Sequence, residues 1–166
     1  MLVTVFGASG FIGQNVVSRL AEKGVKVRAT DIRPMPAGTP KGAEFVGGDI
    51  LDDQHVDQLV EGADVVIHLA VSNLRTSLRN PKRNVKINVQ GTLNIVDAAK
   101  KHKTKKLIYP SASSVYGGPK YTPVDEDHPK NPTTVYGITK YMGEHLIRVY
   151  HELYGLNYFI FRFTNV

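Results

Sequence analysis

A glycine-rich turn close to the N-terminus constrains the fold more than any other feature of the sequence. Gly7, Gly10 and Gly13 directly follow the β-branched run Leu2–Phe6 and open a segment whose apolar residues have helical spacing. Glycines at this G-x-x-G-x-x-G spacing make a tight turn, let a pyrophosphate approach the bare backbone, and present it to the free N–H groups of a helix N-terminus. We therefore predict that this turn binds a dinucleotide.

An acidic residue at the end of the next predicted strand indicates which dinucleotide binds. Asp31 closes the alternating segment Val25–Thr30. It follows Gly13 at close to the spacing of about 20 residues that is typical of dinucleotide-binding units. A carboxylate there accepts hydrogen bonds from the adenosine ribose hydroxyls and repels a 2′-phosphate. The sequence therefore favours NAD over NADP, although Arg33 points the other way.

Strand-like and helix-like segments alternate along the whole chain. The expected strands are Leu2–Phe6, Val25–Thr30, Glu44–Val46, Asp64–Ala70, Lys106–Tyr109 and Tyr158–Phe163, and the expected helices are Phe11–Lys23, Gln54–Val60, Asn84–Lys101 and Val135–Tyr154. The continuous apolar run Asp64–Ala70 is typical of a strand buried on both faces. Repeated β-α-β units predict an α/β fold, a Rossmann-like doubly wound parallel sheet with helices on both faces. We expect residues 1–166 to form one NAD(P)-binding domain.

Composition excludes several other classes of protein. The sequence has no cysteine, which removes disulfide frameworks, thiolate metal sites and cysteine nucleophiles, and we expect no metal site. The longest apolar stretch, Val65–Val71, is far shorter than the ~20 residues that span a bilayer. No basic stretch precedes the N-terminal apolar segment, so it is a poor signal peptide. We expect a cytoplasmic protein with no membrane partner.

Two basic runs raise the question of nucleic-acid binding. The 21 Lys and Arg residues exceed the 15 Asp and Glu residues, which gives a net charge of +6. Much of the excess lies in Arg79–Lys86 and Lys100–Lys106. The second run follows a predicted helix, where cations complement the negative end of the helix dipole. A site for single-stranded nucleic acid combines basic residues with aromatic side chains on which the bases stack, and no aromatic residue interleaves with these lysines. Nucleic acid is therefore a minor alternative, and the main interpretation has no nucleic-acid partner.

A tyrosine and a lysine form a candidate catalytic pair. Tyr136 and Lys140 stand four residues apart near the start of a predicted helix, so both project from one face. A free tyrosine has a pKa near ~10 and is a poor base at neutral pH. A neighbouring ammonium and an oxidised nicotinamide ring would lower that pKa, and the phenolate could then take a hydroxyl proton. The spacing is common on helix surfaces, so the pair is informative mainly in combination with the glycine turn.

In combination, these motifs resemble the extended short-chain dehydrogenase/reductase family, in its NAD-dependent nucleotide-sugar epimerase/dehydratase group. The resemblance covers essentially all of the sequence. Beyond the glycine turn and Asp31, the matching segments are Gly48-Asp49-Ile50, His68-Leu69-Ala70, Asn88-Val-Gln-Gly91-Thr92, Ser113-Ser-Val-Tyr116-Gly117, Tyr136-Gly-Ile-Thr-Lys140 and Arg162-Phe-Thr-Asn165.

The resemblance implies a role for each matching residue. Tyr136 would be the catalytic base, and Lys140 would hold the nicotinamide ribose while tuning Tyr136. Asp49 and Ile50 would contact adenine, and Asn165 would face the phosphates of a sugar nucleotide. The full set of implied cofactor-binding residues, in which Asn88 supports the site from behind, is Gly7, Gly10, Phe11, Ile12, Gly13, Asp31, Asp49, Ile50, Leu69, Ala70, Asn88, Tyr136 and Lys140.

The sequence departs from the family pattern at the serine that links substrate to the catalytic tyrosine. The family has Ser or Thr four residues before the tyrosine of Val-Tyr-Gly, and here that position is Ala112. Either a flanking serine takes the role or the proton relay is impaired, and of Ser111 and Ser113 we favour Ser113 as a catalytic residue. The Asp-Glu pair of the dehydratase subgroup is also replaced, by Ser113 and Ser114, which disfavours elimination of water.

The function implied by the resemblance is epimerisation of a nucleotide sugar, with a UDP-sugar as the expected substrate and transient oxidation at C4 to a 4-keto intermediate. The alternatives are a related NAD(P)-dependent dehydrogenase, reductase or dehydratase, or a non-catalytic cofactor-binding module. Family members continue into a smaller substrate domain, so we expect this sequence to be the N-terminal part of a longer chain whose C-terminal substrate domain is missing. In the family, the helices resembling Asn84–Lys101 and Val135–Tyr154 pack against their copies, which implies a homodimer.

Overall fold

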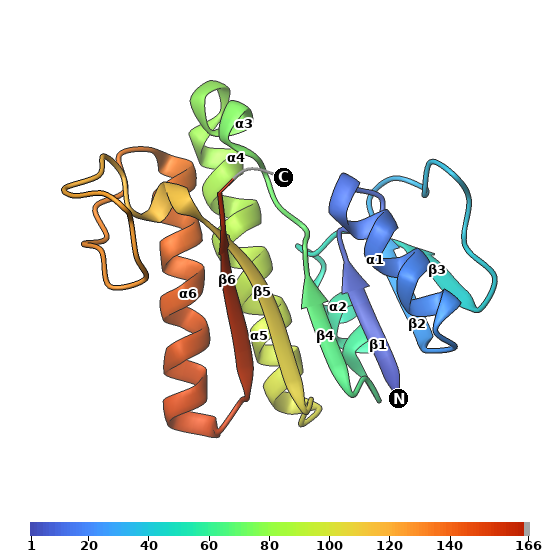
Figure 1. Cartoon of the computed structure of the whole chain (residues 1–166). Helices are drawn as coiled ribbons and strands as arrows, with labels where there is room; N and C mark the ends of the chain where they lie inside the picture. The colour runs from blue at the N-terminus through green and yellow to red at the C-terminus, as the bar shows by residue number, and fades with distance from the viewer. Residues whose placement is uncertain (165–166) are drawn as a thin grey trace.

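Six parallel strands form one sheet at the centre of the protein (Figure 1). The computed structural model describes residues 1–164. The strands are β1 (Leu2–Phe6), β2 (Lys26–Asp31), β3 (Ala43–Gly47), β4 (Val65–His68), β5 (Lys106–Ala112) and β6 (Tyr158–Phe163). They lie in the order β3-β2-β1-β4-β5-β6, so the direction of winding reverses between β1 and β4. Ligands of open α/β sheets bind beyond the carboxyl ends of the strands at such a reversal.

Helices cover the two faces of this sheet unequally. The main helices are α1 (Phe11–Glu22), α2 (Asp53–Val60), α5 (Gly91–Lys101) and α6 (Val135–Tyr154). Of these four helices, only α1 lies on the face turned to the viewer in Figure 1, where it packs on β1 and β2. Right-handed crossovers place the other three on the opposite face, because their connections run across the sheet in the other direction. The predicted Rossmann-like α/β fold is confirmed.

Two short helices precede α5, and the sequence analysis missed the first of them. α3 (Leu74–Arg79) and α4 (Pro81–Val85) follow β4, so the helix predicted to begin at Asn84 begins earlier. The side chain of Asn80 accepts the N–H of Arg83 at 3.0 Å and caps α4, and proline stands at the first helical position. Asparagine followed by proline is a helix-start signal, because the missing proline N–H would be unpaired there anyway.

A π-helical turn, η1 (Lys86–Gln90), joins α4 to α5. A π turn inserts one extra residue and rotates everything beyond it around the helix axis. Val96 is therefore fully buried against the sheet, whereas Val85 is 44% exposed. The spacing of Val85, Val89, Leu93 and Val96 predicts one apolar stripe along the helix Asn84–Lys101, and this prediction is wrong because of the inserted residue.

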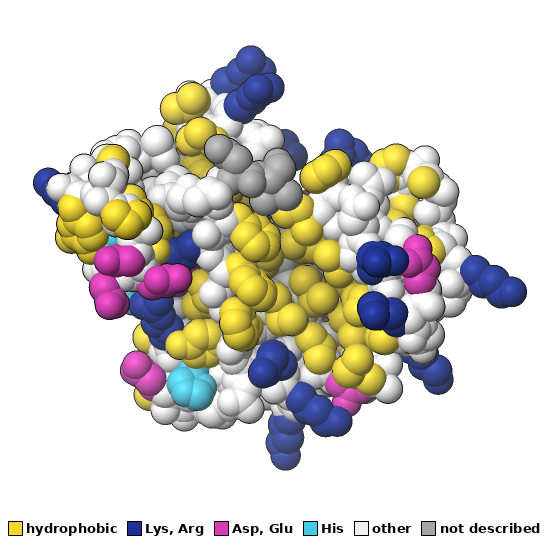
Figure 2. Space-filling model, in the orientation of Figure 1, with side chains coloured by type: hydrophobic (Ala, Val, Ile, Leu, Met, Phe, Trp, Pro, Cys, Tyr) yellow, Lys and Arg dark blue, Asp and Glu magenta, His cyan; other side chains and the backbone are white. Residues whose placement is uncertain are grey.

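β4 is shorter and less buried than predicted. It spans Val65–His68 instead of Asp64–Ala70, and only Val66 and His68 are buried. The prediction that this strand is buried on both faces is wrong. On the α1 side, Val65 and Ile67 are only partly buried at the edge of the cluster that contains Val17 of α1. Figure 2 shows apolar side chains gathered across this surface. The strand register places on this open sheet face Val65, Ile67, Ile108, Pro110, Phe159, Phe161 and Phe163.

β5 extends beyond its predicted end at Tyr109 and carries the chain to the carboxyl edge of the sheet. Leu107 donates its N–H toward the β6 side, to the Asn157 carbonyl oxygen, so Pro110 would donate toward β4. The pairing with β4 already ends at Ile108, and the missing N–H of the proline therefore costs no ladder bond.

α6 begins and ends with strong local signals. The hydroxyl of Thr134 accepts the N–H of Gly137 at 3.0 Å and caps the first turn. Gly155, at φ 72°, ends the helix in the left-handed region, where glycine has no Cβ to crowd the backbone. These bounds match the prediction and fix which face of α6 meets the sheet.

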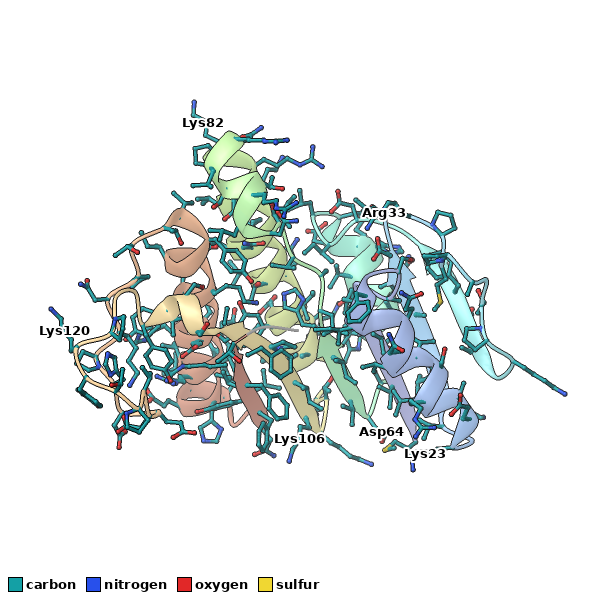
Figure 3. All side chains as sticks on the ribbon, turned by 45° about the horizontal axis from the view of Figure 1, so that its top comes forward. Lys23, Arg33, Asp64, Lys82, Lys106 and Lys120 are labelled. Carbon is teal, nitrogen blue, oxygen red and sulfur yellow. The ribbon has the colours of Figure 1, made fainter. Side chains whose placement is uncertain are left out.

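The two basic runs lie at opposite ends of the molecule. Figure 3 shows Lys82 at the tip of α4 and Lys106 at the other end of the sheet. In the second run, Lys101 and Lys105 pair with Asp57 and Asp64 at 2.9 and 2.7 Å. The runs therefore do not form one continuous basic surface. None of the helices within residues 1–164 has the length and apolar character needed to cross a membrane.

Candidate dinucleotide and catalytic site

The glycine turn packs against the carboxyl ends of β2 and β4. Gly7 has φ 83°, and the N–H groups of Gly7 and Ala8 donate to the Thr30 carbonyl oxygen at 2.9 and 3.0 Å. A Cβ on Gly7 would overlap the backbone of Ala70, and a Cβ on Gly13 would overlap the Gly7 carbonyl oxygen. Both positions require glycine, so the turn leaves a backbone-walled hollow at the switch point of the sheet.

The N-terminus of α1 offers unpaired donors at this hollow. Gly10 is the N-cap, no side chain caps the helix, and the first turn contains no acidic residue. The N–H groups of Phe11, Ile12 and Gly13 have no partner within the helix, because the acceptors would lie before its start. Together with the helix dipole, these groups favour an anion such as a pyrophosphate.

Asp31 is held rigidly beside the turn. Its carboxylate accepts the N–H of Ser9 at 3.1 Å and the N–H of Arg33 at 3.2 Å, and the Ser9 hydroxyl donates to the Arg33 carbonyl oxygen at 2.6 Å. These bonds tie the end of β2 to the glycine turn. The carboxylate therefore faces the same space as the α1 N-terminus.

Two adjacent cavities share the glycine turn, and together they contain most of the predicted cofactor residues. The first, of about 220 Å³, includes Gly7, Gly10, Asp31, Arg33, Asp49, Ile50, Leu69, Ala70 and Arg83 in its lining. The second, of about 330 Å³, includes Gly7, Gly10, Phe11, Ile12, Gly13, Leu69, Ser111, Ala112, Tyr136 and Lys140. One cavity has the acidic strand end and the other has the Tyr-Lys pair. The donors and the glycine-walled space fit an extended dinucleotide lying across both.

Burial sets the protonation of the Tyr-Lys pair. Lys140 is only 4% exposed, and burial lowers its pKa to about 7, although the nearby charge of Glu144 opposes this. Burial also raises the pKa of Tyr136 above its usual value. This direction is opposite to the lowering predicted from the sequence, because desolvation of the phenolate dominates in the protein alone.

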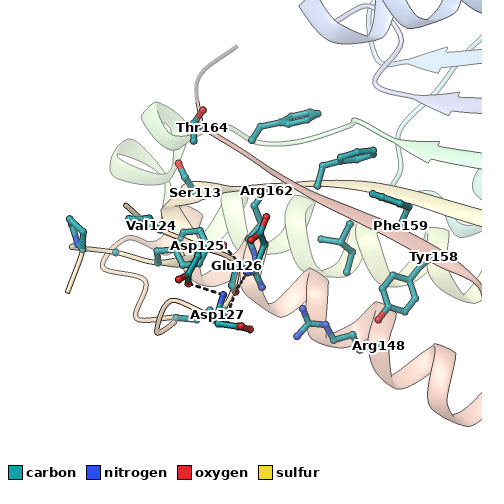
Figure 4. Close-up of a pocket in the computed structure, with 17 residues that line it drawn as sticks. Ser113, Val124, Asp125, Glu126, Asp127, Arg148, Tyr158, Phe159, Arg162 and Thr164 are labelled. Carbon is teal, nitrogen blue, oxygen red and sulfur yellow. Dashed lines mark hydrogen bonds between the residues drawn. The ribbon is translucent and has the colours of Figure 1, made fainter. Parts of the chain in front are cut away.

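The serines before Val115 are divided between two cavities. Ser111 and Ala112 line the cavity that contains Tyr136 and Lys140. Ser113, the residue favoured from the sequence, lines a separate cavity of about 1180 Å³ beside Arg162 (Figure 4). The 3-10 turn η2 (Ser113–Val115) begins at Ser113 and packs against the start of α6, where a Cβ on Gly137 would overlap the Ser114 carbonyl oxygen. Ser111 and Ala112 therefore share a cavity lining with Tyr136, whereas Ser113 does not.

Asn88 lies behind the site and lines neither cavity. In η1 its side chain accepts the N–H of Ser72 at 2.7 Å and donates to the Ser72 carbonyl oxygen at 3.0 Å. It also donates to the Thr139 hydroxyl of α6 at 3.0 Å. These bonds join η1 to the segment after β4 and to α6. The role of Asn88 in supporting or contacting a cofactor stays a prediction. Asn165 lies outside the described residues.

Sequence reasoning assigned no role to three residues that surround Lys140 on its buried side. Tyr109 of β5, Glu144 of α6 and His68 of β4 are all under 3% exposed. The signal for Glu144 was its spacing, because it continues the series Tyr136, Lys140 by four more residues on one helix face. Across the described residues, no group of three or more His, Asp or Glu side chains could hold a metal ion.

The fold and the two cavities define a dinucleotide-binding Rossmann domain of the extended short-chain dehydrogenase/reductase type. The sequence profile of the NAD dependent epimerase/dehydratase family matches residues 3–166. The chain belongs to this family.

Curated relatives and solved structures agree with this assignment. A Methanocaldococcus jannaschii protein, named provisionally as a UDP-glucose 4-epimerase, is 41% identical over 99% of this chain and 56% of its own length. The UDP-glucose 4-epimerase of Halalkalibacterium halodurans is 34% identical over 99% of this chain and 51% of its own length. The crystal structure of UDP-glucose 4-epimerase from Brucella ovis in complex with NAD is similar at a TM-score of 0.92 and 33% identity, over 99% of this chain and 52% of that one.

The Thermotoga maritima UDP-glucose 4-epimerase, solved with UDP-glucose, has a TM-score of 0.90 and 31% identity over 98% of this chain and 55% of that one. The chain spans about half the length of the curated relatives it matches.

Proposed function

We propose that this chain is the NAD-binding and proton-transferring part of a nucleotide-sugar 4-epimerase. The observation that carries the proposal is the shared cavity of the glycine turn and the Tyr136–Lys140 pair. A cofactor ring and a hydroxyl-bearing substrate carbon would have to meet there for the tyrosine to act. The names of the relatives, which include several UDP-glucose 4-epimerases, support a UDP-sugar as substrate.

NAD fits better than NADP. Asp31 places a fixed negative charge where a 2′-phosphate would lie, while the backbone N–H groups of Ser9 and Arg33 neutralise it only partly. Arg33 and Arg83 line the same cavity and would attract a 2′-phosphate, so we expect the preference for NAD over NADP to be partial. When bound, NAD would supply a two-electron acceptor that is regenerated in each turnover, so none would be consumed.

The residues of this chain would hold and move one proton. Tyr136 Oη would take the proton of the sugar 4-hydroxyl while C4 is oxidised, and would return it after the 4-keto sugar has turned over. Lys140, when protonated, would stabilise the phenolate and offset the desolvation that raises the pKa of Tyr136. General-base help of this kind is worth about 10²–10⁴-fold in rate. We assign the linking hydroxyl to Ser111, because Ser111 lines the cavity that contains the pair and Ser113 does not.

We also propose a homodimer. Four apolar side chains are exposed on one face of α6, with exposed fractions from 45% to 65%; they are Ile138, Met142, Val149 and Leu153. Val85 of α4 is 44% exposed and borders a groove of about 620 Å³ that reaches Val135 at the start of α6. An apolar stripe shared by two neighbouring helices is a self-complementary surface for a second copy. Sedimentation of the whole protein, compared with Met142→Glu, would test this assembly.

The decisive experiment follows UDP-galactose and UDP-glucose by proton NMR with the whole protein and a catalytic amount of NAD. We expect interconversion without net formation of NADH. Tyr136→Phe should abolish turnover and leave NAD affinity, measured by calorimetry, within about threefold. Tyr141→Phe on the same helix removes a hydroxyl outside the cavity and should keep full activity. Stoichiometric NADH would favour a dehydrogenase, and NAD binding without turnover of any sugar would favour a non-catalytic module.

A further inference from the structure

Lys140 is a buried cation that lacks the usual partners. Its side chain projects from α6 into the sheet, and the residue is 4% exposed. Within residues 1–164 it makes neither a hydrogen bond nor an ion pair. A buried ammonium in this condition tends to lose its proton, because its hydration is not replaced. If Lys140 is to act on Tyr136 as a cation, something else must stabilise the charge.

The aromatic face of Tyr109 lies directly against the ammonium. Lys140 Nζ is 3.9 Å from the centre of the Tyr109 ring, well inside the ~6 Å range over which a ring face attracts a cation. Tyr109 is 1% exposed, so little water screens the contact. Desolvated contacts of this kind are at the strong end of their range.

The ring is fixed in this position from two sides. A Cβ on Gly143 of α6 would overlap the Tyr109 hydroxyl, so glycine at that position is what lets the ring reach the helix. On the other side, the His68 ring lies 5.5 Å away, centre to centre. The Tyr109 hydroxyl itself has no hydrogen-bond partner within the described residues. The contact therefore uses the face of the ring and not its hydroxyl.

The other titratable groups facing Lys140 do not replace this contact. Burial, and then the charge of Lys140, lower the pKa of His68 to about 3, so His68 is neutral at pH 7. Burial raises the pKa of Tyr109, which keeps it a neutral phenol. Glu144, one helical turn away, is engaged by Arg162 and Arg148. Tyr136, one turn away in the other direction, is the group on which Lys140 would act.

We propose that Tyr109 is a positioning residue for Lys140, and that its ring face favours the charged form of the ammonium and directs it into the cavity beside Tyr136. The proposal rests on the proposed function in one respect, the assignment of Lys140 as the partner of Tyr136. The contact itself involves only the side chains of Tyr109 and Lys140. It can therefore be measured without cofactor or substrate.

The test is the pKa of Lys140 in the whole protein, followed by NMR of ¹³C- and ¹⁵N-labelled lysine and assigned with Lys140→Met. Tyr109→Phe keeps the ring face, and Tyr109→Leu removes it while keeping an apolar side chain. We expect the pKa of Lys140 to be the same in Tyr109→Phe as in the native protein. In Tyr109→Leu we expect it to fall by about one unit, a tenfold change in the ratio of charged to neutral lysine. Lys100, which lies 4.9 Å from the ring of exposed Tyr154, is the internal reference and should not shift.

Two results would overturn the proposal. One is a Lys140 pKa that does not change in Tyr109→Leu. The other is a Lys140 pKa that falls as far in Tyr109→Phe as in Tyr109→Leu, which would assign the effect to the hydroxyl. If Tyr109→Leu does not fold, fluorinated phenylalanines at position 109 replace it. The pKa should then fall with each added fluorine, and a flat series would reject the proposal. Failure of the native protein to bind NAD would contradict the proposed function and leave these titrations interpretable.

Discussion

Arg162 of β6 forms a bidentate ion pair with Glu144 of α6. Nε and Nη2 of Arg162 donate to the two carboxylate oxygens at 2.9 and 2.8 Å, and Glu144 is fully buried. The remaining terminal nitrogen of Arg162 donates to the Tyr116 hydroxyl at 2.9 Å and to the Glu126 carbonyl oxygen at 3.0 Å. One guanidinium therefore joins β6, the helix of the Tyr-Lys pair and the loop after β5.

Removing one partner of this pair should destabilise the protein strongly. We expect Arg162→Leu to lower the free energy of unfolding by about 3 kcal/mol, because it leaves a buried carboxylate with only the partly exposed Arg148. Urea unfolding measures the change. The double variant Glu144→Gln, Arg162→Leu should recover part of the loss. Arg19→Leu breaks an exposed pair with Glu22 and should cost no more than about 0.5 kcal/mol. If Arg162→Leu and Arg19→Leu lower the free energy of unfolding equally, the buried ion pair contributes no more than the exposed one, and the prediction is wrong.

Stability should rise with pH on the alkaline side because of Lys140. Burial lowers its folded-state pKa to about 7 from an ordinary value of 10.5. Between these values the unfolded chain carries the proton and the folded protein does not, so raising the pH favours folding. We expect the free energy of unfolding to increase from pH 7 toward pH 10, at a slope that approaches ~1.4 kcal/mol per pH unit where the effect is complete. Thermal or urea unfolding across this range measures it.

Lys140→Met is the matched control for this pH dependence, since it keeps the length of the side chain and removes the titrating group. Its unfolding free energy should be flat over the same interval, apart from changes shared with the native protein. If the unfolding free energy of the native protein is as insensitive to pH as that of Lys140→Met, then burial does not lower the pKa of Lys140 and the prediction is wrong.

Two glycines with similar backbone angles should respond differently to alanine. Gly7 and Gly38 have φ values of 83° and 76°, but a Cβ on Gly7 overlaps Ala70 whereas one on Gly38 meets open space. Gly7→Ala should weaken NAD binding at least tenfold, because the turn must shift away from the end of β4. Gly38→Ala carries only the left-handed strain of about 1–2 kcal/mol and should bind NAD normally. Calorimetry with both variants measures this, and similar affinities would mean that the turn does not wall the site.

The two serines that flank Ala112 should differ in their effect on turnover. Ser111→Ala in the whole protein should reduce kcat by about 10²-fold with little change in NAD affinity, because Ser111 lines the Tyr136 cavity. Ser113→Ala should change kcat less than threefold, since Ser113 faces the other cavity. Ala112→Ser restores the hydroxyl at the usual family position and should raise the rate. The opposite ranking of the two alanine variants would support Ser113, as the sequence alone suggested.

Local signals made most of the scaffold predictable. The glycine turn, Asp31 and the two ends of α6 depend on residues adjacent in sequence, and all lie where the sequence indicated. The wrong predictions concern contacts between distant segments. The π turn at Lys86–Gln90 has no composition signal, and it changes which face of the helix Val96 occupies. Ser111 and Ser113 are equivalent in sequence, and only the path of the chain after β5 separates them. Tyr109 reads as an ordinary strand residue until α6 is packed against it.

The last strand has a consequence for the chain before it folds. Tyr158–Phe163 reads Tyr-Phe-Ile-Phe-Arg-Phe, six residues of high β-propensity with one charge and no proline. Short segments of this kind stack readily into cross-β aggregates, and a single charge within them acts as a gatekeeper. That charge belongs to Arg162, which folding then neutralises against Glu144. The same guanidinium would thus protect the nascent chain from self-association first and bind Glu144 of α6 afterwards. Replacing it should reduce the yield of soluble protein even at temperatures where the fold survives.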